Sequence, residues 1–210
     1  MEVHPPHGPV QSIKEFMVHL LAITIGLLIA LGLESTVEWF HHRHLVHDAR
    51  ENIRAEIRAN EDNVLRHAAA MPLEEKRLQA ILANVEEAER GRPQKALGAF
   101  NWTFNFPVDS AWNATSSSGA IAWMKYEEVK RYSRLYDFQR LYASYVEHYL
   151  EERHEMNILL ARMNEGNKLP EAELENGKRT IESEIIRTRE LREMDSTLGN
   201  AYAEMLAREK

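Results

Sequence analysis

One uninterrupted apolar run near the N-terminus most constrains what this chain can fold into. Residues 16–33 read FMVHLLAITIGLLIALGL, with one histidine and no formally charged side chain. As a helix, about eighteen residues extend for roughly 27 Å, which is close to the thickness of a bilayer's hydrocarbon core. Trp39 and Phe40 follow shortly after the acidic Glu34, and such aromatic pairs are typical of a membrane–water interface. The run therefore predicts a transmembrane helix over residues 16–38.

Two other interpretations of this run stay open, as does its orientation. A buried core helix of a soluble protein would need an apolar face around it, and the rest of the chain offers none that is large enough. A cleaved signal peptide is the second alternative, because Ala30 and Gly32 have the small-x-small spacing that signal peptidase accepts. Lys14 precedes the run and several arginines follow it, which slightly favours a cytoplasmic C-terminal domain. The side of the membrane that the domain occupies therefore stays undecided.

Composition limits the functions that the rest of the chain can have. The formal net charge is −7 and no basic stretch offsets it, so we expect no nucleic-acid partner. The chain has no cysteine, which excludes disulfides, thiolate metal ligands and a cysteine nucleophile. The sequence has no Gly-rich phosphate loop, no His-Glu-x-x-His motif and no serine paired with a nearby His or Lys. We therefore expect no enzyme activity, no catalytic residue, no cofactor and no metal site.

Apolar periodicity predicts that the remainder of the chain is helical. A helix continues out of the membrane with a mostly apolar stripe at three- and four-residue steps, namely Val46, Ala49, Ile53, Ile57, the polar Asn60 and Val64. Pro72 suits the first turn of a second helix, which would end at Gly91 and Pro93. Two further helices of about 40 residues, joined near Gly166, carry near-heptad seams that include Tyr142, Tyr149, Met156, Ile181, Thr188, Asp195 and Tyr202.

These patterns predict an all-α fold, with an N-terminal transmembrane helix that continues into a juxtamembrane helix and a C-terminal helical hairpin or bundle. The predicted segments are an N-terminal tail (1–15), the transmembrane helix (16–38), a juxtamembrane helical hairpin (39–91), an aromatic-rich connecting segment (92–125) and a long antiparallel hairpin (126–210). In the connecting segment, Asp109 or Ser110 could begin a short helix. Its aromatic side chains either close one end of the bundle or form a ligand or partner surface, with Trp102, Trp112 and Trp123 as the candidates.

A stripe of mostly small residues runs along the predicted transmembrane helix. Ala22, Gly26, Ala30 and Glu34 are spaced by four, so they lie on one slowly drifting face. Small residues at this spacing let two helix backbones approach closely in lipid. We therefore predict that the helix self-associates through this stripe into a homo-oligomer, although the same residues could simply face lipid. At the edge of the span, Glu34 is either an interfacial carboxylate in contact with water or a proton or cation site.

A histidine cluster follows the predicted span. His41, His44 and His47 are spaced by three and share a helix face, while His42 points elsewhere. Imidazoles at this spacing can share a Zn²⁺, Ni²⁺ or Cu²⁺ ion. Histidine also changes its charge near neutral pH, so the cluster could instead sense pH. We therefore assign no metal site to the cluster, and whether it binds a metal ion or senses pH stays open.

Two blocks of the chain resemble a group of uncharacterised bacterial single-pass membrane proteins. The first block runs from FMVHLLAITIGLLIALGLESTVEWFHHRH to ENIRAEIRANEDNV and contains a Glu-x-x-x-Asn pattern at Glu56 and Asn60. The second block is DSAWNATSSSGAIAWM, which a Tyr-rich helix follows. The resemblance implies an architecture and a location in the bacterial cytoplasmic membrane, and it assigns no functional residue.

These observations together favour a non-catalytic, membrane-anchored helical protein. We expect it to act in scaffolding, assembly or signal sensing through helix–helix association, with the lipid bilayer and a second copy of itself as partners. The alternative is an accessory or pore-forming subunit of a homo-oligomeric membrane complex, in which clustered spans bring Glu34 and the histidines around a shared axis. Ligand, signal and protein partner cannot be read from the sequence.

Overall fold

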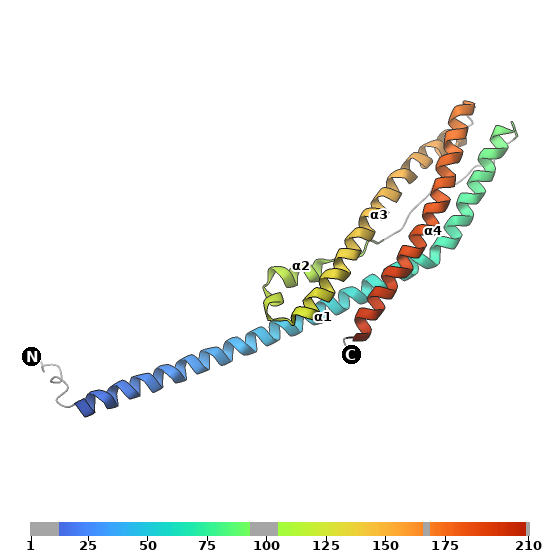
Figure 1. The fold of residues 1–210 in the computed structure, drawn as a ribbon. Helices are drawn as coiled ribbons and strands as arrows, with labels where there is room; N and C mark the ends of the chain where they lie inside the picture. The colour runs from blue at the N-terminus through green and yellow to red at the C-terminus, as the bar shows by residue number, and fades with distance from the viewer. Residues whose placement is uncertain (1–12, 93–104, 166–168, 209–210) are drawn as a thin grey trace, which may run out of the picture. The chain divides into compact units, whose positions relative to one another are not determined.

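The computed structural model describes residues 13–92, 105–165 and 169–208, and every regular element in these ranges is helical (Figure 1). This confirms the all-α fold class. The chain divides into two compact units, Met1–Asp48 and Ala49–Lys210. The elements are α1 (Ile13–Glu89), α2 (Ser110–Ser117), a short 3-10 helix η1 (Ala120–Trp123), α3 (Tyr126–Asn164) and α4 (Glu171–Arg208).

In the first unit, α1 presents an apolar surface that the chain leaves uncovered. Every residue from 16 to 33 is exposed, and the large apolar side chains among them have exposed fractions between 47% and 69%. This part of α1 is long and apolar enough to cross a membrane, and none of it is buried within the chain. In water, so large a contiguous apolar surface is rare on a protein that works alone.

In the second unit, the later part of α1 packs with α3 and α4 into a helical bundle. The helices α3 and α4 run antiparallel and side by side, as Figure 1 shows, which confirms the C-terminal hairpin. All three helices contribute to one apolar core cluster, which comprises Leu78, Ile81, Val85, Met156, Leu160, Met163, Leu169, Leu174, Ile181 and Ile185. The stripe predicted for the helix that leaves the membrane is also buried, with Ile53, Ile57 and Val64 at 0% exposure.

The structure corrects one prediction about α1. We expected a second helix that starts at Pro72, but α1 continues through Pro72 to Glu89, so residues 39–91 do not form a hairpin. A proline inside a helix removes one backbone hydrogen bond and crowds an earlier carbonyl, at a cost of about 3 kcal/mol. Met71 and Leu78 lie on either side of it and are both buried, so core packing offsets this cost. In the continuous helix, Leu73 faces outward with 70% of its surface exposed.

Candidate functional site

A buried carboxylate on α1 holds the short helix α2. Glu56 accepts hydrogen bonds from the Ser110 hydroxyl at 2.8 Å, the Ala111 backbone N–H at 2.7 Å and the Tyr136 hydroxyl at 2.7 Å. Helix N-termini have unpaired N–H groups and a partial positive charge, so a carboxylate there is stabilising. Asp109 occupies the N-cap position, as predicted, but its side chain makes no capping bond. Glu56, from another helix, supplies that acceptor instead.

Asn60 lies one turn further along α1 and ties down the segment that precedes α2. Its side-chain nitrogen donates to the Val108 carbonyl at 2.7 Å, and its side-chain oxygen accepts from the Val108 N–H at 3.0 Å. The same nitrogen lies 3.2 Å from Gln139 Oε1, which accepts from the Tyr202 hydroxyl at 2.6 Å. Asn60 therefore links α1, α3 and α4 and also the connecting segment. Glu56 thus joins its own helix to the segment that begins at Asp109, and Asn60 holds the residue just before that segment.

A buried His–Asp–Tyr group forms the next level of contacts. His67 Nδ1 lies 2.7 Å from Asp195 Oδ2, and the Tyr142 hydroxyl donates to Asp195 Oδ1 at 2.5 Å. The Asp195 side chain is 0% exposed and that of His67 is 6% exposed. One carboxylate thus joins α1, α3 and α4. Buried carboxylates of this kind are stabilised by the donors around them and are costly when those donors are removed.

A buried arginine forms the level furthest along the bundle. Arg153 on α3 is 3% exposed and pairs with Glu74 on α1. It also donates to the Tyr149 hydroxyl, and its Nε lies 3.5 Å from Glu184 Oε2 on α4. Its guanidinium also lies 4.7 Å from the Tyr149 ring centroid. Thr188 completes the level, since its hydroxyl lies 2.9 Å from that of Tyr149. Charged groups this deep in a protein require such pairing.

We call these contacts the polar ladder. It comprises Glu56, Asn60, His67, Glu74, Tyr136, Gln139, Tyr142, Tyr149, Arg153, Glu184, Thr188, Asp195 and Tyr202. Burial raises the pKa of its four tyrosines above the ordinary value, and these are Tyr136, Tyr142, Tyr149 and Tyr202. The adjacent carboxylates of Glu56 and Asp195 raise the pKa of Tyr136 and Tyr142 further. All four hydroxyls therefore stay protonated. Those of Tyr136 and Tyr142 donate to carboxylates, and that of Tyr202 donates to the Gln139 side-chain oxygen.

Sequence periodicity identified only part of the ladder. It placed six members on the packing seams, and all six are buried, namely Asn60, Tyr142, Tyr149, Thr188, Asp195 and Tyr202. It did not find His67, Arg153 or Glu184, because each lies among many charged residues on a helix that looks solvated. On each of the three helices, the missed polar residue lies in register with an apolar seam, and this pattern is the one that could have identified it.

The stripe predicted for the span lies in the first unit. Ala22, Gly26, Ala30 and Glu34 are all exposed there. A Cβ built on Gly26 would have no atom within 4 Å, so nothing in the chain itself requires glycine at this position.

The tryptophan candidates take different positions. Trp112 is buried and stacks on Tyr136 with ring centroids 5.5 Å apart and an interplanar angle of 10°, and it also contacts Tyr132 at 6.1 Å. Trp123 is 57% exposed, and Trp102 lies outside the described residues. Trp112 is thus a core residue that packs α2 on α3.

The histidine cluster follows the exposed apolar segment on α1. The rings of His41 and His42 lie 5.8 Å apart, and His44 Nε2 lies 3.4 Å from Asp48. The Arg43 guanidinium lies 5.2 Å from the Trp39 ring centroid. Among the residues that the structure describes, no group of three or more His, Asp or Glu side chains is arranged to hold a metal ion.

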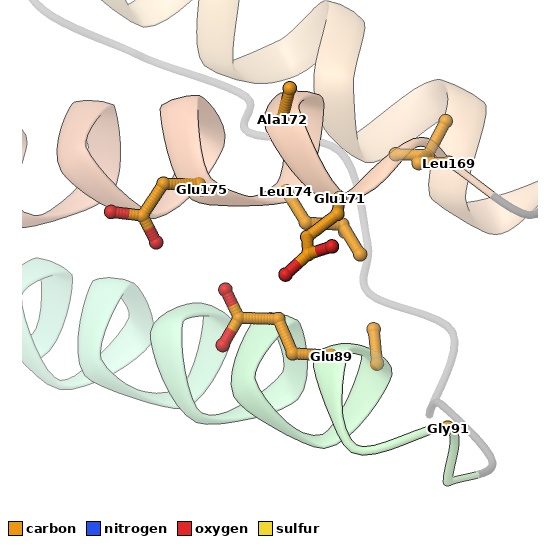
Figure 2. A pocket seen from close by; sticks show the side chains of 8 residues that line it. Glu89, Gly91, Leu169, Glu171, Ala172, Leu174 and Glu175 are labelled. Carbon is orange, nitrogen blue, oxygen red and sulfur yellow. The ribbon is translucent and has the colours of Figure 1, made fainter.

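A cavity lies where α1 ends and α4 begins (Figure 2). It has a volume of about 860 Å³, and Glu89, Glu171 and Glu175 line it together with the apolar Leu169 and Leu174. Lys178 Nζ lies 3.7 Å from Glu89 Oε2 and partly balances this charge. The cavity is separate from the polar ladder, whose groups bond to one another.

No protein-family model, curated protein or solved structure matches the chain.

Proposed function

We propose that this chain is a single-pass, membrane-anchored and non-catalytic helical protein that acts in scaffolding, assembly or signal sensing through helix–helix association. The observation that carries the proposal is the uncovered apolar surface of α1 over residues 16–33. Twelve large apolar side chains in this segment are about half exposed. Full burial of one such side chain is worth about 1.5–3 kcal/mol, so lipid would stabilise the segment on the order of 15 kcal/mol.

The polar groups of this segment also suit lipid. Thr24, Ser35 and Thr36 donate their hydroxyls to the carbonyl four residues earlier, at 2.7–2.8 Å. His19 Nδ1 lies 2.9 Å from the Glu15 carbonyl in the same way. Groups that bond within their own helix carry less desolvation cost into a bilayer. This supports a spanning segment, and the family resemblance supports the bacterial cytoplasmic membrane as its location.

The glycine in the stripe supports self-association as the mode of action. Gly26 has open space around it, so its small size serves no contact within the chain. A glycine costs about 1 kcal/mol relative to alanine in a helix, and close approach of a second backbone would offset this cost. Ala22 and Ala30 extend the same face by one turn on each side. A second copy of the chain is the partner that this face fits.

The polar ladder supports a structural role for the second unit. Its ionisable side chains point into the bundle and pair across three helices. Buried polar contacts of this kind can fix the register of packed helices. An active site would instead direct such groups into a cavity where substrate can bind. We therefore interpret the second unit as a rigid helical module that a span holds at the membrane.

Span association in a membrane reporter tests the proposal. We expect Gly26→Ile to reduce the signal at least fivefold, because the branched side chain keeps the two backbones apart. Gly32→Ile is the matched control, since Gly32 also has open space around it but lies about 120° around the helix from Gly26. Equal signals for the two variants would contradict association through the stripe. Mass determination of the full chain in detergent would then separate a dimer from a larger ring.

A further inference from the structure

A basic cavity in the second unit has no role in the proposed function. It has a volume of about 270 Å³ and lies where α3 begins, beside the end of α4. Its lining has two glutamates against five basic side chains, namely Arg50, Arg54, Lys125, Arg131 and Arg208. One of the two glutamates, Glu128, is already neutralised by Arg50 through bonds of 2.6 and 2.7 Å. The start of α3 adds the partial positive charge of a helix N-terminus. Five basic and two acidic side chains leave the lining with a formal excess of three positive charges, within a chain of net charge −7.

Arg131 is the central side chain of this cavity. It is half-buried, and its Nε is shielded from water without a hydrogen-bond partner among the described residues. Its guanidinium also makes no ion pair in the described part of the chain, although neighbouring arginines do. A guanidinium offers five N–H donors in a fork that matches the oxygens of phosphate or carboxylate. An oxyanion in the cavity would pair with the terminal N–H groups of this guanidinium.

A second cavity shares Arg131 and Arg208 with the first and differs in character. It has a volume of about 350 Å³, and four apolar residues line it together with the charged Arg134 and Glu204. The apolar residues are Leu135, Phe138, Ala201 and Met205. These side chains come from α3 and α4, so the hollow follows the seam between the two helices. The two cavities therefore place an apolar hollow next to a positive one, with the Arg131 guanidinium at their junction.

From this arrangement we infer that the second unit binds an anionic amphiphile, with a phosphate-type head at Arg131 in the basic cavity and an alkyl chain in the adjoining apolar hollow. Either part alone is small and open to solvent. A ligand that carries both an anionic head and an alkyl chain occupies both cavities. Each methylene of the chain that leaves water then tightens binding by about fourfold. A membrane phospholipid and a soluble alkyl phosphate share this chemistry.

Titration of the full chain with hexyl phosphate tests this inference. The chain is held in phosphatidylcholine nanodiscs, and calorimetry at pH 7 compares hexyl phosphate with inorganic phosphate and with hexanol, with empty nanodiscs as the blank. We expect hexyl phosphate to bind at least tenfold more tightly than either part. Absence of saturable binding would overturn the inference. Equal binding of inorganic phosphate would also overturn it, because the apolar hollow would then have no role.

Substitutions assign the binding to Arg131. We expect Arg131→Met to weaken hexyl phosphate binding at least tenfold, whereas Arg140→Met, which removes an exposed arginine from the same helix outside both cavities, leaves it unchanged. Lys125→Met is a second variant that cannot disturb the core, since Lys125 is exposed, and we expect a two- to fivefold loss. Unchanged affinity in both Arg131→Met and Lys125→Met would refute the site. Nanodiscs that contain phosphatidic acid distinguish a membrane lipid from a soluble ligand. If the site takes membrane phospholipid, phosphatidic acid competes and lowers the apparent affinity for hexyl phosphate. If it takes a soluble alkyl phosphate, the affinity stays the same.

Discussion

Replacing Tyr142 by phenylalanine removes one buried hydroxyl from the polar ladder and keeps the ring that packs around it. The hydroxyl donates to Asp195 Oδ1 at 2.5 Å, and Asp195 is 0% exposed. A hydrogen bond to a charged group is worth about 1.5–3 kcal/mol, and its loss leaves the buried carboxylate with one donor fewer. We therefore expect Tyr142→Phe to lower the free energy of unfolding by about 2–3 kcal/mol.

The chain offers a matched control on the same helix. Tyr145 also donates its hydroxyl to a carboxylate, that of Glu190 at 2.7 Å, but this bond lies at the surface. Water replaces the lost partner there, so Tyr145→Phe should cost less than about 1 kcal/mol. The two variants thus differ mainly in the burial of the bond that each one removes.

Urea unfolding of the full chain in detergent micelles, followed by helical circular dichroism, measures both costs. Tyr142→Phe should shift the midpoint downward while the dependence on urea concentration stays the same. Equal destabilisation by the two variants would refute the reasoning, because burial would then not strengthen the contact with Asp195. A loss of under about 0.5 kcal/mol for Tyr142→Phe would refute it as well.

Three further outcomes follow from the same structure. The pKa values of Tyr136, Tyr142, Tyr149 and Tyr202 are raised in the folded chain, so the unfolded chain loses these protons first. Their contribution to the free energy of unfolding is therefore complete below about pH 10. Above that pH it falls by up to about 1.4 kcal/mol per pH unit for each tyrosine, and urea titrations between pH 9 and 11 would detect the fall. Leu78→Ala, at a fully buried site, should cost about 2–5 kcal/mol, whereas Leu73→Ala, at a site 70% exposed, should stay within about 0.5 kcal/mol by the same assay. Glu56→Ala should speed hydrogen exchange in α2, measured at the Ala111 amide, while the amides in the middle of α4 keep their protection.

Sequence periodicity was sufficient for most of the fold because apolar seams on long helices repeat many times. Most positions predicted from the 3.6-residue repeat on α1 and α4 are buried, among them Ile53, Ile57, Ile181 and Tyr202. The error at Pro72 has a physical cause. A local rule places proline at a helix start, but packing on both sides of this proline keeps α1 continuous.

The polar ladder was harder to predict because its partners are far apart in sequence. His67 and Asp195 are separated by 128 residues, and Glu56 and Tyr136 by 80. Each of these side chains alone is typical of a solvated helix face, and only the packing of three helices brings them together. The cavity at Arg131 escaped prediction for the same reason, since its basic residues come from three separate helices.

The fate of the full chain in fractionated cells tests the anchoring role of α1 most directly. After an alkaline carbonate wash, we predict that the intact chain stays with the membrane pellet, that detergent releases it, and that its measured mass still includes residues 16–33. Recovery of the intact chain in the wash supernatant would contradict membrane anchoring. A mass that lacks these residues would identify the apolar run as a signal peptide and would contradict it equally.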